Sequence, residues 1–180
     1  LVNASTTQLT TTGNTYLATT AGNVGIGTTG PGRTLDVRVD NATTNAVSYV
    51  ADFYHTTSGT PANGIGGGII LGAERTVGDA VAAVALHGII TDVSDVSNDG
   101  GALAILTRKA GTLTEALRVI GSGNVGIGTT GPAVKLHVLG SSSVRIRAET
   151  SSGAVADLLS DSSNGYVGTN SAHDFHLLTN

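Results

Sequence analysis

The sequence contains no cysteine, methionine or tryptophan, and only 3% of its residues are aromatic. Without cysteine no disulfide can staple a small core, and with so few aromatic side chains one copy has little to fill a thick one. The net charge of −4 is too small for a disordered chain, and the β-branched residues Val, Ile and Thr are abundant. We therefore expect an ordered chain of small side chains that gains its core by associating with other copies of itself.

Two classes of partner are disfavoured by what the sequence lacks. No apolar run approaches the ~18 residues of a membrane span, and the longest candidate, Ala80 to Leu86, is short and rich in alanine. The nine Lys and Arg residues are scattered through an acidic chain, which leaves no basic surface for nucleic acid. We expect neither membrane insertion nor nucleic-acid binding. Because the chain begins at Leu1 without methionine, we interpret it as a piece of a longer polypeptide.

A ten-residue segment occurs twice without change. The sequence Gly-Asn-Val-Gly-Ile-Gly-Thr-Thr-Gly-Pro spans Gly22–Pro31 and begins again 101 residues later (123 − 22), at Gly123–Pro132. In the first copy Val24 and Ile26 alternate with glycines, so a strand there has one apolar face and one bare face that allows close backbone approach. Turn residues follow, and the alternation resumes at Leu35. Each copy is therefore predicted to be a strand–turn–strand module.

A strand with one apolar face and a glycine back cannot make a core alone. Three copies around an axis bring the apolar faces together from three sides, and shared sheets also remove exposed strand edges. Such an obligate oligomer has no stable folded monomer. We predict that the apolar positions of both modules form the core of a homotrimer. They are Val24, Ile26, Leu35, Val37, Val125, Ile127, Leu136 and Val138.

The rest of the chain also has β character. Strands are predicted over Ala46–Tyr54, Ile65–Arg75, Ala80–Asp92, Ala102–Arg108, Thr114–Ile120, Val144–Arg147, Ala154–Leu159, Gly165–Gly168 and Asp174–Leu178. Propensity alone would also allow a helix over Ala80–Leu86, but this run lacks a polar face and leads into β-branched residues. The predicted parts are a Thr-rich N-terminal segment or linker (1–21), the first module (22–40), a middle β-domain (41–121), the second module (122–140) and a distal β-segment (141–180).

The repeated module resembles a signature of phage tail-fibre and related host-attachment proteins. In that family the motif is typically Gly-Asn-Val-Gly-Ile-Gly-Thr-Thr-Ser-Pro, followed after a few residues by Lys-Leu-His-Val, which Lys135–Val138 matches here. Gly30 and Gly131 stand where Ser is usual, a change within turn chemistry. The middle region and the tail after Gly165 also look like parts of such fibres, so the resemblance covers most of residues 22–180.

The resemblance implies an all-β, elongated and intertwined homotrimeric fibre, in which the short modules flank a β-sandwich-like middle domain. It implies a structural and adhesive virion component that supports attachment to the host surface. Its partners would be itself, other fibre or baseplate proteins, and a host cell-surface glycan or protein. A cellular surface adhesin or secreted filament of the same architecture, located outside the cell, is the alternative, and a glycan-degrading tailspike is a third. A secretion signal would separate the second from the first, and activity on polysaccharide would identify the third.

Other motifs invite sharper interpretations that the sequence does not favour. Gly64–Gly68 looks like a phosphate-binding loop, but the run Ile69–Leu71 after it is strand-like and no Gly-Lys-Ser/Thr follows. One loop carries Asp92, Asp95, Asn98 and Asp99. Its spacing does not match the helix–loop–helix calcium pattern, so we prefer a solvated turn. His173 and His176 would point to opposite faces of a strand, so they cannot share a metal within one chain. A single His facing a three-fold axis could present three imidazoles to one ion, but we prefer ordinary surface or interface histidines.

Charged side chains do not form a recognisable catalytic set. Asp36, Asp52 and Glu74 could act as acids, but nothing in the sequence pairs them as glycan cleavage would require. Arg145 and Arg147 lie on one strand face, where we expect them to be solvated or paired with acids of a neighbouring chain. We therefore expect no catalytic, cofactor or metal site, and we interpret the chain as a structural protein rather than an enzyme.

Overall fold

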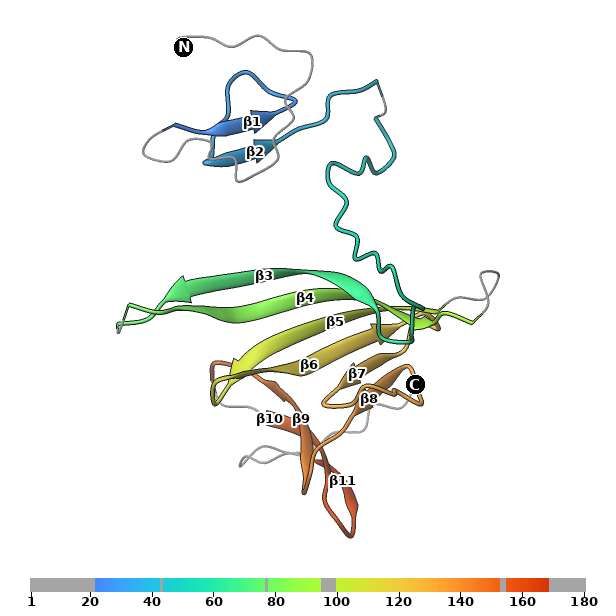
Figure 1. Ribbon diagram of the computed structural model, residues 1–180. Coiled ribbons are helices and arrows are strands. Elements are labelled where there is room, and N and C mark those ends of the chain that lie inside the picture. Colours follow the sequence, from blue (N-terminus) through green and yellow to red (C-terminus); the bar gives the residue numbers. More distant parts are fainter. Residues whose placement is uncertain (1–21, 43, 77, 95–99, 153–154, 169–180) are drawn as a thin grey trace. The chain divides into compact units, whose positions relative to one another are not determined.

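The computed structural model describes residues 22–42, 44–76, 78–94, 100–152 and 155–168. Every regular element in these residues is a β-strand, which confirms the predicted all-β class. The chain divides into two compact units, Leu1–Phe53 and Tyr54–Asn180, which are described separately. The five-part division of the sequence stays a prediction. The strands (Figure 1) are β1 (Val24–Ile26), β2 (Leu35–Val37), β3 (Gly66–Glu74), β4 (Ala80–Asp92), β5 (Gly100–Lys109), β6 (Thr112–Ile120), β7 (Val125–Ile127), β8 (Leu136–Val138), β9 (Val144–Glu149), β10 (Val155–Ser160) and β11 (Gly165–Gly168).

The first unit contains the sheet of the first module. Its two short strands, β1 and β2, run parallel, with Val24 opposite Leu35 and Ile26 opposite Val37. Parallel strands usually need a long crossover connection. Here the Thr-Thr-Gly-Pro turn and the few residues after it return the chain to the start of β1, so that β2 can run beside it in the same direction. The module is therefore a strand, a turn and a strand, as the sequence predicts.

The second unit contains a six-stranded sheet in the sequential order β3-β4-β5-β6-β7-β8. The strands from β3 to β7 are antiparallel to their neighbours, and β7 and β8 are parallel like the strands of the first module. Strand β4 spans Ala80–Asp92, so the alanine-rich run is a strand, as predicted. A three-stranded antiparallel sheet follows, in which β10 lies between β9 and β11.

Three expectations from the sequence need comment. The predicted strand over Ala46–Tyr54 is wrong, because this stretch has no regular structure. The middle region contributes a single sheet, which continues without a break into the second module, instead of the two layers of a sandwich-like domain. The predicted strand over Asp174–Leu178 and the N-terminal segment lie outside the described residues.

The second unit buries only small hydrophobic side chains. The buried hydrophobic residues among those described are Ala85, Ala102, Ala104 and Val155, and no large side chain is fully buried. Burying a large aliphatic side chain contributes roughly 1.5–3 kcal/mol, so a chain without one gains little from its own core.

The hairpin between β5 and β6 generates the first testable prediction. Its two-residue turn places both Ala110 (φ 47°) and Gly111 (φ 90°) in the left-handed region, which suits a hairpin whose preferred sequence is Asn-Gly. Since a left-handed conformation costs an ordinary residue roughly 1–2 kcal/mol, Ala110→Asn should raise the melting temperature. Ala133→Asn, at an exposed turn position without a positive φ, is the control and should change it little. Equal effects of the two substitutions would contradict this account of the turn.

Candidate functional site

The two copies of the module have the same local geometry. In the first copy the Asn23 side-chain amide donates to the Pro31 carbonyl oxygen at 2.9 Å, and in the second copy Asn124 donates to Pro132 at 3.1 Å. The first threonine hydroxyl accepts a hydrogen bond from the glycine two residues later, at 3.2 Å in both copies. The registers also match, because Val24 lies opposite Leu35 and Val125, 101 residues on, lies opposite Leu136. The ten shared residues thus encode one structure twice.

The glycines of the module are required by its own turn. A Cβ atom on Gly25 or on Gly126 would lie 2.5 Å from the carbonyl oxygen of the threonine three residues later. Gly27 and Gly128 have φ values of 72° and 74°, and a Cβ on either would overlap a carbonyl oxygen of the chain that follows the second strand. The close approach expected from the sequence therefore occurs within one chain, between each strand and its own turn.

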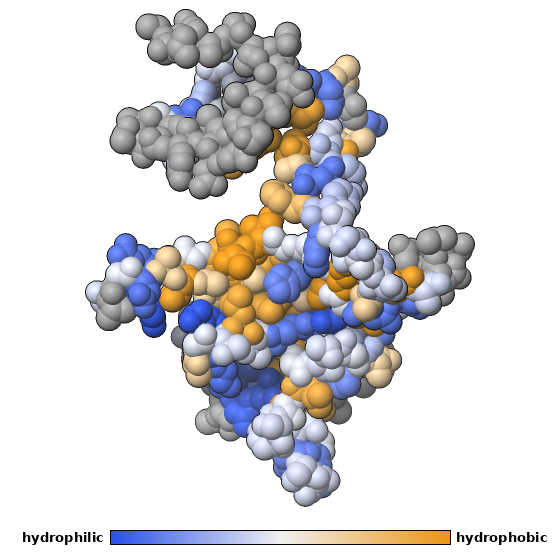
Figure 2. Space-filling view, in the orientation of Figure 1, coloured by the Kyte–Doolittle hydropathy of each residue, from blue (hydrophilic) through white to orange (hydrophobic). Residues whose placement is uncertain are grey.

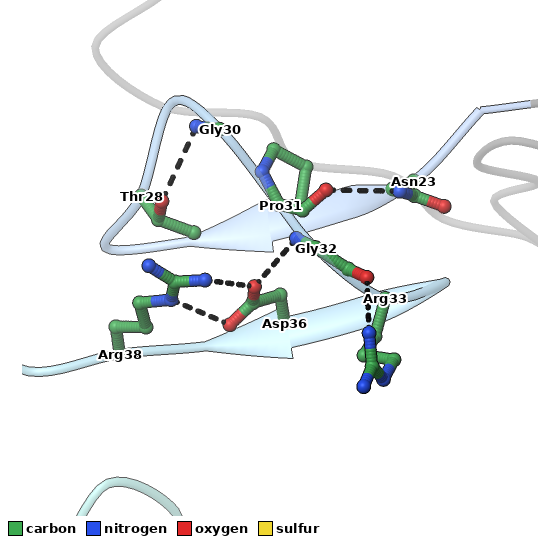
Figure 3. A network of polar contacts seen from close by, with 8 residues as sticks. All are labelled: Asn23, Thr28, Gly30, Pro31, Gly32, Arg33, Asp36 and Arg38. Carbon is green, nitrogen blue, oxygen red and sulfur yellow. Dashed lines mark hydrogen bonds and ion pairs between the residues drawn. The ribbon is translucent and has the colours of Figure 1, made fainter.

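A side chain from the second strand of each module holds the turn in place. In the first copy the Asp36 carboxylate accepts hydrogen bonds from the Gly32 amide at 2.8 Å and from Nε and Nη2 of Arg38 at 2.9 and 2.7 Å (Figure 3). The Arg38 hydrogen bond, followed by that from Gly32, lowers the pKa of Asp36. In the second copy His137 occupies the equivalent position, and its Nδ1 accepts from the Ala133 amide at 3.3 Å. Asp36, a candidate acid in the sequence, thus has a structural role.

The eight predicted core residues fall on a single apolar face in each module. Side chains of partners in register point to the same side of a sheet, and residues two apart along a strand do so as well. In the second module Val125 is paired with Leu136, and Ile127 with Val138, so these four share a face. The first module has the same pairing. The alternation in the sequence predicted this shared face, and the assignment of these residues to a trimer core remains a prediction.

The second module extends its apolar face across all six strands of the sheet. Continuous pairing places one aliphatic residue from every strand in a single row: Ile69, Leu86, Ile105, Leu117, Ile127 and Val138. The next row on the same side contains Gly67, Gly88, Leu103, Val119, Val125 and Leu136. We call the surface formed by these two rows the apolar face. The sequence missed the cross-strand rows, because alternation within a strand does not reveal which residues lie opposite one another.

The apolar face is open to solvent within one chain. Its exposed fractions are 43% for Ile69, 46% for Leu103 and 42% for Ile127. On the side seen in Figure 2, hydrophobic residues gather mainly over β3 and β4. Exposed apolar patches that extend beyond scattered single residues mark interaction surfaces in soluble proteins. This face is the strongest candidate for a functional surface among the described residues.

The opposite face of the sheet is covered by the chain's own side chains. Ala85 and Ala104 are fully buried there. Arg118 lies opposite Ala104 on the neighbouring strand. Its guanidinium donates two hydrogen bonds, of 2.8 and 2.6 Å, to the Glu115 carboxylate, and these raise the pKa of the arginine. The His87 ring lies so close over Gly68 that a Cβ there would be 2.7 Å from it. This opposite face is mixed, because Arg118 and Glu115 are paired within the chain, while Ile70, Ile89, Leu106 and Ile120 also lie on it. We keep the name polar face for it because it carries this ion pair.

The three-stranded sheet divides in the same way into a polar and an apolar face. On the polar face Arg147 binds the Asp157 carboxylate with two hydrogen bonds of 2.9 and 3.0 Å, and Arg145 approaches it at 3.5 Å. The hydrogen bond from Arg147 is the main cause of the lowered pKa of Asp157. Both arginines are therefore paired within the chain, whereas the sequence suggested solvent or an acid of a neighbouring chain.

The apolar face of the three-stranded sheet borders an open hollow of about 720 Å³. Ile146, Leu158 and Val167 line it and are 42%, 51% and 66% exposed. Hydroxyl-bearing residues from Ser141 to Ser143 form part of its rim. The lining mixes aliphatic side chains with serines, and its surface is more apolar than polar, so the hollow resembles the apolar face of the larger sheet more than a polar ligand site.

The other candidates from the sequence do not assemble a site. Gly66 and Gly68 belong to β3 and pack against β4, so these glycines serve close packing instead of a phosphate loop. Asp92 accepts hydrogen bonds from the amide and hydroxyl of Ser94, which lower its pKa, while Asp95, Asn98 and Asp99 lie outside the described residues, as do His173 and His176. Asp52 is exposed.

No group of three or more His, Cys, Asp or Glu residues that could hold a metal occurs in the described part of the chain. The same residues contain no helix long and apolar enough to cross a membrane. In comparisons with known proteins, no protein-family model and no curated protein sequence matches the chain.

The glycine packing predicts a sharp contrast between two glycines of one turn. Gly126→Ala places a methyl group against the Thr129 carbonyl, whereas a Cβ on Gly131 meets nothing within 4 Å. Overpacking of this kind costs roughly 1–3 kcal/mol, so Gly126→Ala should lower the thermal midpoint measured by circular dichroism. Gly131→Ala, the matched control, should leave it nearly unchanged. A midpoint for Gly126→Ala equal to that of the control would contradict the turn geometry.

The Asp157 ion pair predicts a loss of stability in acid. Because the folded-state pKa lies below the ordinary one, the pair contributes above about pH 4, and its contribution disappears as the pH falls through the folded value. The difference in melting temperature between the parent and Asp157→Asn should therefore be largest near neutral pH and shrink toward pH 2. Asp52→Asn removes an exposed carboxylate and should show no such difference. A gap between the parent and Asp157→Asn that stays constant with pH would rule out this role.

Proposed function

We propose that this chain is a structural and adhesive segment of a viral tail fibre, and that it works as a homotrimer whose copies meet through their apolar faces. The observation that carries the proposal is the apolar row that crosses six strands in register, in which Ile69, Leu86 and Ile127 are exposed in the single chain and the other three residues are half-buried. The tail-fibre context comes from the resemblance of the repeated module to host-attachment proteins. The role is mechanical, to hold a receptor-binding end away from a particle and to contribute to surface contact.

The energetics favour association through this face. Each Leu or Ile side chain that moves from water into an interface contributes roughly 1.5–3 kcal/mol, and a trimer gains each contribution three times. Ala85 and Ala104 are fully buried, and they belong to the opposite face of the sheet. The larger aliphatic side chains of the apolar face keep part of their surface in water in a lone chain, and a second and third copy would cover them.

The polar faces support the same orientation. Arg118 pairs with Glu115 and Arg147 pairs with Asp157, all within one chain. Because these charges already have partners within the chain, they do not require an acid or a base from a neighbouring copy. The aliphatic side chains of the apolar face have no such cover among the described residues, and we therefore place that face toward the trimer interior.

The trimer is tested by sedimentation velocity on the purified chain. The proposal predicts a species of three times the chain mass of 17.9 kDa, with a frictional ratio above that of a compact protein. Ile127→Asp places three carboxylates in the apolar interior, where unpaired charge is costly, and should abolish the trimer. Ser122→Asp adds the same charge in the exposed turn between β6 and β7 and should keep it. A folded monomer of the parent at micromolar concentration would falsify the proposal.

A further inference from the structure

Strand β3 is an unprotected sheet edge. It spans nine residues and, among the described strands, pairs only with β4, so alternate backbone amides and carbonyls on its outer side have no partner within that set. Exposed edges are usually blocked by proline, lysine, inward charges or short length. The sequence Gly-Gly-Gly-Ile-Ile-Leu-Gly-Ala-Glu has none of these except one carboxylate at its end. The bulge between Leu71 and Gly72 still leaves Gly66–Leu71 as an uninterrupted stretch.

The other long edge strand shows the contrast. Strand β9 borders the three-stranded sheet and carries Arg145, Arg147 and Glu149 along its six residues. Strands β8 and β11 end their sheets after three and four residues. Among the described strands, β3 is thus the one long edge with an uninterrupted stretch, Gly66–Leu71, that carries no charge, lysine or proline.

A second segment of the chain has the complementary property. Residues Ala46–Tyr54 lack glycine and proline, and the sequence predicts a strand there, but they have no regular structure in the single chain. Val47, Tyr49 and Tyr54 are 82%, 86% and 85% exposed. Three of the six aromatic residues of the whole chain fall within this stretch. Within the described residues, no backbone–backbone hydrogen bond involves it.

We propose that Ala46–Tyr54 of one copy adds as a strand to the outer edge of β3 of a neighbouring copy. Strand addition satisfies the open backbone groups of both partners through main-chain hydrogen bonds. Strand addition also places aromatic side chains beside the glycine-rich start of β3. There Gly67 and Gly88 leave part of the apolar face without side chains. Aromatic residues on a neighbouring strand stabilise glycines at a sheet edge in this way. The predicted strand thus forms in the assembly and not in the isolated chain.

The occupant that we propose is a neighbouring copy, because the proposed self-association supplies the β3 edge of one copy to the segment of another. Residues 55–65 join this stretch to β3, and the hydrogen bonds between Ile65 and Ile90 and between Gly64 and Ile90 fix the start of β3. The inference rests on the proposed function and adds a strand-edge contact to the packing of the apolar faces. Pairing of the segment with its own β3 is the competing arrangement, and the experiment separates the two.

The experiment uses the absence of native cysteine. Ala51→Cys and Ile70→Cys are combined in one chain, the assembled protein is treated with a short bismaleimide, and the products are separated on a denaturing gel. Bands of two and three joined chains are expected, because each segment lies against the β3 of another copy. The two single-cysteine variants control for adventitious contacts and should give markedly less of these bands.

Proline variants test whether the contact is a paired strand. Val50→Pro removes an amide donor from the middle of the segment and should reduce the joined bands several-fold, while Thr57→Pro, in the exposed connector, should not. Cross-linking only within one chain, or none in a protein that sediments as a trimer, overturns strand addition and leaves the proposed function standing. A monomer in sedimentation overturns both.

Discussion

The structure depends on one constraint: a sheet with an apolar face needs a cover, and the described residues of this chain do not supply one. Two rows of mostly aliphatic side chains cross six strands in register, but the buried hydrophobic residues are small ones such as Ala85 and Ala104. The scarcity of aromatic residues in the sequence contributes to this condition, since no large side chain among the described residues is fully buried. Self-association solves the problem at low cost, since each new copy brings the same surface.

The repeated module is determined by local packing rather than by its surroundings. Both copies have the same turn, although the first forms its own two-stranded sheet and the second completes a larger one. The reason lies in the glycines, since a Cβ atom on Gly25 or on Gly126 would lie only 2.5 Å from the carbonyl oxygen of a threonine in the turn. Any other residue would therefore displace that carbonyl. Asp36 and His137 show what can vary, because two different side chains accept the hydrogen bond from the turn. A sequence of this kind can be inserted in different contexts without losing its structure.

The sequence predicted those features that depend on alternation along a strand. Strand β4 has the predicted bounds, and the residues of each module that were assigned to one face share it. Features that depend on which strands are neighbours were not predictable, among them the parallel pairing within each module and the merging of the second module with the middle sheet. Arg147 pairs with Asp157 for the same reason, since the partner comes from the next strand. Ala46–Tyr54 was predicted as a strand from its composition, but a strand also needs a paired neighbour.

The central claim is that the apolar faces of different copies pack against one another. The most direct test is a nuclear Overhauser measurement on a sample that mixes ¹³C-methyl-labelled and unlabelled chains, filtered for contacts between chains. The account predicts contacts between copies from the methyl groups of Leu117, Ile127 and Val138. Contacts between copies that arise only from the opposite face, near Ala104 and Arg118, or the absence of any contact in a protein of trimeric mass, would contradict it.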